Sequence, residues 1–175
     1  RYGQIVPIAE GMRVRFSDIG HLLGSACIEF WLREDGTEKK IVFSGDVGNI
    51  DQPILNDPLP VAETDYLVVE STYGNRLHGP RPDYVPKDVR AELTDVLQRA
   101  FDRGGSVIIP AFAVGRTQEL LYLLREIKQK KLVHGHDGFP VYLDSPLAEE
   151  ATSVFLQCDA DCFDSETQAV LKSGQ

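Results

Sequence analysis

Two loops of the sequence each place one residue of a metal-ligating type directly after an apolar run. His21 lies in the glycine-flanked stretch 18–26, and Asp46 lies in the glycine-flanked stretch 43–48. An imidazole nitrogen and a carboxylate oxygen together suit a divalent metal ion. A catalytic zinc normally has three protein ligands and one open position. His21 and Asp46 therefore supply only part of such a site.

Two further strand-like runs also end in a carboxylate. Glu70 closes the apolar run 65–70, and Asp144 follows the run 141–143. A rigid sheet can hold residues at its strand ends in a fixed geometry. Each of these residues taken singly could instead have a purely structural role, because an Asp in a glycine-rich turn often only stabilises the turn through hydrogen bonds to the backbone. Several such ends in one chain favour a functional site.

The composition limits the class of protein. The chain has 175 residues, of which 42% are hydrophobic and 26% charged, and this mixture is typical of a soluble globular protein. The formal net charge of -9 excludes a bulk basic attraction to nucleic acid. No apolar run approaches the ~20 residues that span a bilayer, so we expect no membrane association. Three cysteines without a secretion signal indicate a reduced, cytoplasmic setting, and Cys27 is expected to be buried.

Alternating apolar and polar residues in the first third predict short strands at 4–8, 13–17, 26–32 and 40–43. The turn-forming residues Glu34–Thr37 join the last two. The continuous apolar run 65–70 predicts a strand buried on both faces.

Beyond Gly74 the pattern changes to alternating helices and strands. Residues 76–86 are rich in Pro, Gly and charge and predict a linker. The expected elements after it are a helix from Val89 to Phe101, a strand at 106–110, a helix around 120–127, a strand at 141–143, and a helix that Ser145 and Pro146 open. This order is typical of an α/β unit, and it places a domain boundary near residue 75.

Five motifs, in this order, resemble those of the β-CASP branch of the metallo-β-lactamase superfamily. They are Gly20-His-Leu-Leu-Gly-Ser-Ala26, Ser44-Gly-Asp-Val-Gly48, Val68-Val-Glu-Ser-Thr-Tyr-Gly74, Ile109-Pro-Ala-Phe-Ala-Val-Gly-Arg-Thr-Gln-Glu-Leu-Leu121 and Val141-Tyr-Leu-Asp-Ser-Pro-Leu-Ala148. The likeness is closest to bacterial and archaeal RNA-processing nucleases, which are similar to the endonuclease subunit of the eukaryotic pre-mRNA cleavage machinery. It implies an α/β fold. Residues 1–75 would form the C-terminal part of a metallo-β-lactamase domain with a partial sheet, and residues 76–175 the first part of an α/β β-CASP domain.

The resemblance also implies roles for three residues. His21 would bind one zinc ion, and Asp46 would bridge two, because a carboxylate can hold two cations together while offsetting their repulsion. Glu70 would orient a later histidine that protonates the leaving oxygen. Asp46 and Glu70 are thus the expected catalytic residues, and His21 and Asp46 the expected metal ligands.

The family pattern has further ligands before His21 and further histidines after residue 175. We therefore expect the chain to be an internal piece of a zinc-dependent ribonuclease that carries two zinc ions when intact. The piece alone would be inactive and would bind zinc weakly or not at all. One alternative is a DNA-processing β-CASP nuclease. Another is a catalytically dead β-CASP scaffold subunit, although the presence of His21, Asp46 and Glu70 argues against it.

Two residues of the second half are candidates for binding RNA phosphates. Ser145 at a helix N-terminus could receive a phosphate, or it could be a plain N-cap. Arg116 could pair with a phosphate bidentately, or it could form a salt bridge with a residue such as Glu119. The expected partner is RNA, and self-association into a homodimer stays open. His134 and His136 are expected in a surface loop, and His78 in the solvated linker.

Overall fold

The computed structural model describes residues 1–76 and 88–173 and the side chains of residues 1–76 and 88–172. His78 and all but Arg76 of the predicted linker lie outside these residues. The chain divides into two compact units. The sheet unit consists of Arg1–Leu77 and Asp159–Gln175, and the helical unit consists of His78–Cys158. The domain assignment at residue 75 stays a prediction.

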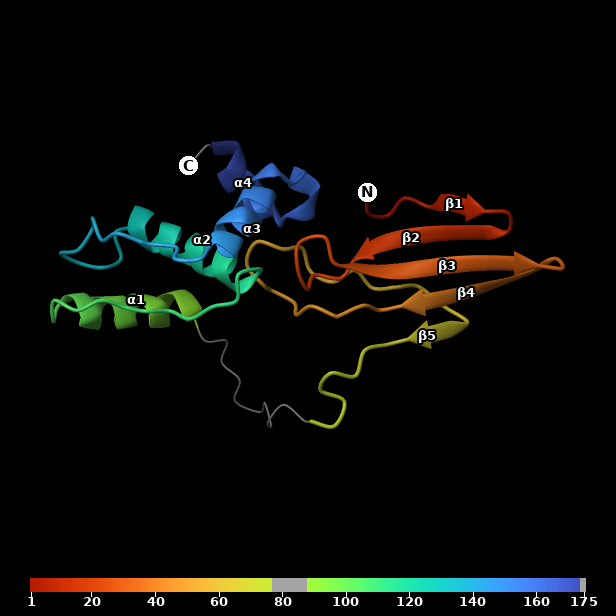
Figure 1. The fold of residues 1–175 in the computed structure, drawn as a ribbon, viewed down its shortest axis with the longest axis horizontal. Coiled ribbons are helices and arrows are strands. Elements are labelled where there is room, and N and C mark those ends of the chain that lie inside the picture. The colour runs from red at the N-terminus through yellow and green to blue at the C-terminus, as the bar shows by residue number, and fades with distance from the viewer. Residues whose placement is uncertain (77–87, 174–175) are drawn as a thin grey trace. The chain divides into compact units, whose positions relative to one another are not determined.

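The sheet unit contains one five-stranded sheet whose spatial order follows the sequence (Figure 1). Its strands are β1 (Val6–Ala9), β2 (Met12–Asp18), β3 (Ala26–Glu34), β4 (Thr37–Phe43) and β5 (Tyr66–Val68). The four strands predicted before residue 44 are confirmed. Asp35 and Gly36 both have positive φ angles, +48° and +78°, between the paired residues Glu34 and Thr37. Positive φ at both central residues is the requirement of a type I′ two-residue hairpin turn, and Asp-Gly satisfies it.

The pairing pattern brings three strand ends to the same end of the sheet. β3 runs antiparallel to both β2 and β4, and β5 runs parallel to β4. β2, β4 and β5 therefore point in one direction. The loops that follow them, which carry His21, Asp46 and Glu70, leave the sheet at a common end.

The prediction that run 65–70 is buried on both faces is wrong. β5 comprises only Tyr66–Val68, and these residues are 53–59% exposed. β5 is the last strand in the sheet order and pairs only with β4. An apolar run can form a strand wherever a ladder partner exists, but burial needs a second layer, and the described residues provide none over β5.

The core of the sheet unit lies near the shared strand end. Ile19, Cys27 and Val42 are buried together, and Val61 packs against them, which confirms the expectation for Cys27. The segment 159–173 adds the short helix η1 (Ala160–Cys162) and the helix α4 (Ser165–Ser173). Phe163 between them is almost fully buried and forms a β-bridge with Leu55.

The helical unit contains the three predicted helices, α1 (Val89–Phe101), α2 (Arg116–Gln129) and α3 (Pro146–Gln157). The Asp88 side chain caps α1 by accepting the Ala91 N–H. One buried cluster of this unit consists of Leu97, Leu124, Ile127, Val133 and Phe139. None of the helices described here combines the length and apolar character that crossing a bilayer requires.

The strands predicted at 106–110 and 141–143 are absent. Neither segment pairs with another strand in the described part of the chain, and Ile108 and Tyr142 are 91% and 85% exposed. β propensity makes such runs suitable for a sheet, but a strand exists only as a paired ladder. The fold class is nevertheless the predicted mixture of α and β structure.

Candidate metal centre

His21, Asp46 and Glu70 come together at the common end of β2, β4 and β5. The Nε2 atom of His21 lies 4.0 Å from Oδ2 of Asp46, and both side chains are exposed to solvent. Two ligands of a tetrahedral zinc at about 2.0–2.2 Å lie about 3.3–3.6 Å from each other, so the two side chains must approach by a few tenths of an ångström to share one ion. Within residues 1–76 and 88–173 no third His, Cys, Asp or Glu joins them in a complete metal-binding group. The donor types and their spacing fit a divalent metal, as two ligands of a larger set.

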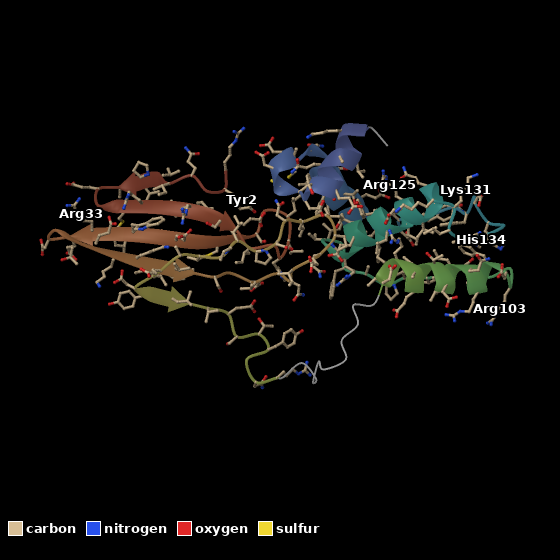
Figure 2. All side chains as sticks on the ribbon, turned by 180° about the vertical axis from the view of Figure 1, so that it is seen from behind. Tyr2, Arg33, Arg103, Arg125, Lys131 and His134 are labelled. Atoms are coloured by element: carbon tan, nitrogen blue, oxygen red, sulfur yellow. The ribbon has the colours of Figure 1, made fainter. Side chains whose placement is uncertain are left out.

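Hydrogen bonds from within its own loop and from the N-terminal segment hold the His21 loop. The Ser25 hydroxyl accepts the backbone N–H groups of His21 (3.2 Å) and Leu22 (3.1 Å). The buried Asp18 carboxylate accepts the N–H of Gly20 at 3.0 Å. The Tyr2 hydroxyl donates to the carbonyl oxygen of Ser25 at 2.7 Å. Figure 2 shows Tyr2 at this end of the sheet, opposite the end that carries Arg33.

The Asp46 loop is tied to Glu70. The Glu70 carboxylate accepts the backbone N–H of Val47 at 2.6 Å, directly beside Asp46. The buried Ser44 hydroxyl accepts the N–H of Glu70 at 3.1 Å and donates to the carbonyl of Gly45. These bonds connect the loop after β4 to the loop after β5.

Glu70 is held as an anion. The hydrogen bond from the Thr72 hydroxyl (2.5 Å), the bond from the Val47 N–H and the nearby His21 lower the pKa of the Glu70 carboxyl. The role expected from the sequence, orientation of a later histidine, stays a prediction. The contact with Val47 was missed, because nothing in the spacing of Asp46 and Glu70 indicates it.

The two residues predicted to bind phosphate, Ser145 and Arg116, lie in the helical unit. Each forms the structural contact that was considered as the alternative to phosphate binding. The Ser145 hydroxyl caps α3 by accepting the Ala148 N–H at 3.2 Å. The Arg116 guanidinium forms an ion pair with Glu119 at 2.6 Å, while its side chain stays 62% exposed. Neither contact excludes a phosphate, so both binding roles stay predictions.

The remaining candidates belong to the helical unit, whereas this centre belongs to the sheet unit. Asp144 is exposed in the helical unit. His134 and His136 lie in the expected loop after α2, where His136 Nε2 is 3.0 Å from Asp102 Oδ1. Sequence reasoning did not single out Asp18, Ser25 or Ser44 as supports of the site. The only available signal was their position at strand ends, one or two residues from a glycine.

Comparison with known proteins shows which families of protein this chain resembles. The Beta-Casp domain profile matches residues 117–174. The chain is 34% identical to Ribonuclease TTHA0252 of Thermus thermophilus over 99% of its length. It is 36% identical over 85% of its length to an RNase J-like protein of Methanocaldococcus jannaschii, and 33% identical over 83% to Endoribonuclease YSH1 of Candida glabrata.

Residues 117–174 thus match the Beta-Casp family, and the chain is similar to these ribonucleases over most of its length, in agreement with the five motifs. It spans 37%, 33% and 18% of the lengths of these three relatives. The nucleases of this family are metal-dependent, which agrees with the donor types of His21 and Asp46.

Proposed function

We propose that the protein carrying this chain is a zinc-dependent ribonuclease that hydrolyses phosphodiester bonds of RNA. The observation that carries the proposal is the convergence of His21 and Asp46 at one end of the sheet. It occurs in a chain whose relatives include proteins named ribonuclease and endoribonuclease. His21 and Asp46 are 25 positions apart in the sequence, and the fold brings their side chains to within 4.0 Å of each other.

Each residue of the centre has a distinct task in this proposal. Zinc, when bound, lowers the pKa of water to generate hydroxide near neutral pH and polarises the phosphate. His21 supplies a neutral nitrogen, and the bonds to Ser25 fix its backbone. Asp46 supplies a carboxylate with exposed oxygens that can face two cations. Glu70 keeps a fixed negative charge behind the Asp46 loop through its bond to the Val47 N–H.

RNA binding must come from local groups, because the net charge of -9 opposes it overall. Bound cations can invert the local potential in a cleft of an acidic protein. Arg116, with an exposed guanidinium, and Ser145, at the N-terminus of α3, are the proposed phosphate contacts. No observation favours DNA as the substrate or a scaffold role. Cytoplasmic location is part of the proposal because all three cysteines are free, and homodimer formation is left open.

The test is the substitution Asp46→Ala in the protein expressed from its complete coding sequence. Cleavage of a labelled RNA should fall to the uncatalysed background, because the carboxylate ligand is lost. Far-UV circular dichroism and the thermal unfolding midpoint of the metal-free protein should stay unchanged, since Asp46 is exposed. Glu10→Ala is the matched control, because it removes an exposed carboxylate in the turn before β2, at the opposite end of that strand from the His21 loop. Undiminished cleavage by Asp46→Ala would remove Asp46 from the mechanism.

A further inference from the structure

The two ligand-bearing loops touch through glycine backbone. Gly48, two residues after Asp46, donates its N–H to the carbonyl oxygen of Ile19 at 2.9 Å. A Cβ atom on Gly48 would lie 1.9 Å from the Gly20 carbonyl oxygen and 2.6 Å from the His21 backbone nitrogen. Real Cβ atoms do not approach backbone this closely, so only glycine fits at position 48 while the His21 loop stays where it is.

The His21 loop also lies close to a second segment. A Cβ on Gly20 would lie 2.7 Å from the carbonyl oxygen of Asn56 and 3.0 Å from Pro58. The Leu59 N–H donates to the carbonyl of Asp18 at 3.0 Å and holds the segment 56–59 in place. The peptide that precedes His21 is therefore in close contact with both the Asp46 loop and the segment 56–59.

Ser25 holds the His21 loop through hydrogen bonds within the loop. Its hydroxyl accepts two consecutive N–H groups, those of His21 and Leu22. Its carbonyl oxygen in turn accepts a hydrogen bond from the Tyr2 hydroxyl. Ser25 thus fixes the peptide after Gly20, while Gly48 fixes the distance between the loops.

We propose that Gly48 and Ser25 are positioning residues of the metal centre. The absent side chain at Gly48 lets the two loops meet backbone to backbone, and the Ser25 hydroxyl locks the His21 backbone. Together they set the separation of the His21 imidazole and the Asp46 carboxylate. This inference rests on the proposed function, which assigns His21 and Asp46 as ligands. Neither residue touches substrate, so neither is a catalytic residue.

The first test is Gly48→Ala in the protein expressed from its complete coding sequence. The added methyl group forces the loops apart, so zinc affinity should fall about 10- to 100-fold, the range typical of lost support behind a metal ligand. Zinc affinity is measured by competition with a chromophoric chelator. The visible absorption of the cobalt(II)-substituted protein should change as well, because it reports ligand geometry independently of activity. Gly138→Ala is the control, since a Cβ there meets nothing within 4 Å and the residue has no positive φ.

A second pair of variants separates positioning from folding. Ser25→Ala removes the acceptor of two N–H groups without adding an atom, and should weaken zinc binding and change the cobalt spectrum. Ser25→Thr keeps the hydroxyl and should restore most of the affinity. If Gly48→Ala lowers the thermal unfolding midpoint so far that it cannot be loaded, the Ser25 pair alone decides.

The outcomes distinguish the two proposals. If Asp46→Ala binds zinc like the wild type, the proposed function fails. If Asp46→Ala loses zinc while Gly48→Ala and Ser25→Ala keep wild-type affinity and an unchanged cobalt spectrum, the positioning inference is overturned and the proposed function stands. For a Gly48→Ala protein that cannot be loaded, wild-type behaviour of Ser25→Ala overturns it equally.

Discussion

Glu29 on β3 is a fully buried carboxylate that two cationic side chains and one hydroxyl group bind. Arg15 binds it through two nitrogens at 2.7 and 2.8 Å, Lys40 lies 2.7 Å away, and the Ser17 hydroxyl donates at 2.9 Å. Burial by itself would raise the pKa of Glu29. The hydrogen bonds from Arg15, Lys40 and Ser17 outweigh it and lower the pKa to about 2. The ionised form is therefore the one that the folded protein stabilises.

Glu29→Gln should lower the free energy of unfolding by about 3 kcal/mol at pH 7, because it leaves Arg15 and Lys40 without a counter-charge. The folded-state pKa lies below the ordinary value of 4.5, so the stability that Glu29 confers is complete above about pH 5. It is lost as the pH falls toward about 2. Urea unfolding between pH 7 and pH 3 should show the wild type and the variant converging. A constant difference between them would contradict the lowered pKa.

At the scale of elements, the hairpins and helices follow from local signals in the sequence. The Asp35-Gly36 turn fixes the register of β3 and β4, because only residues that tolerate positive φ fit there. The helix α3 begins where Ser145 and Pro146 predict it. Such signals act over a few residues and need no distant partner.

The elements that sequence reasoning got wrong depend on distant partners. Segments 106–110 and 141–143 have the apolar character of strands, but no ladder pairs them in the described chain. The residues and contacts of the candidate metal centre show the same difference between local signals and distant partners. His21 and Asp46 were found by motif, whereas the Glu70–Val47 bond and the Gly48–Gly20 contact are long-range packing that residue type does not encode.

The cap of α3 allows its structural role to be separated from a phosphate-binding role. Ser145→Ala should lower the free energy of unfolding by about 1 kcal/mol, because the Ala148 N–H loses its acceptor. Ser145→Asp should retain stability, since Asp is an equally good N-cap, and should raise the KM for RNA because its charge repels phosphate. Both are measured by urea unfolding and by steady-state cleavage in the complete protein. An unchanged KM for Ser145→Asp would show that Ser145 only caps the helix and does not bind phosphate.

At the scale of the molecule, each unit has its own buried cluster, yet many large apolar side chains stay exposed. In the sheet unit these include Phe16 and Phe43, and in the helical unit Ile108 and Phe112. Buried contacts therefore stabilise the regions around the strand ends and around α1 and α2. The candidate metal centre stands on the better-packed end of the sheet, beside Ile19, Cys27 and Val42.

The described part of residues 1–175 contains only part of the candidate metal centre. We therefore expect residues 1–175 alone to bind zinc more weakly than the protein expressed from its complete coding sequence. Two converging ligands fall short of the three that a catalytic zinc normally has. Residues 1–175 expressed alone should lose added zinc on dialysis, as measured by elemental analysis, and should not cleave RNA. The protein expressed from its complete coding sequence should retain zinc under the same dialysis. Stoichiometric zinc in the 175-residue chain that Asp46→Ala removes would show that this chain completes the centre by itself, and would place a third ligand within it.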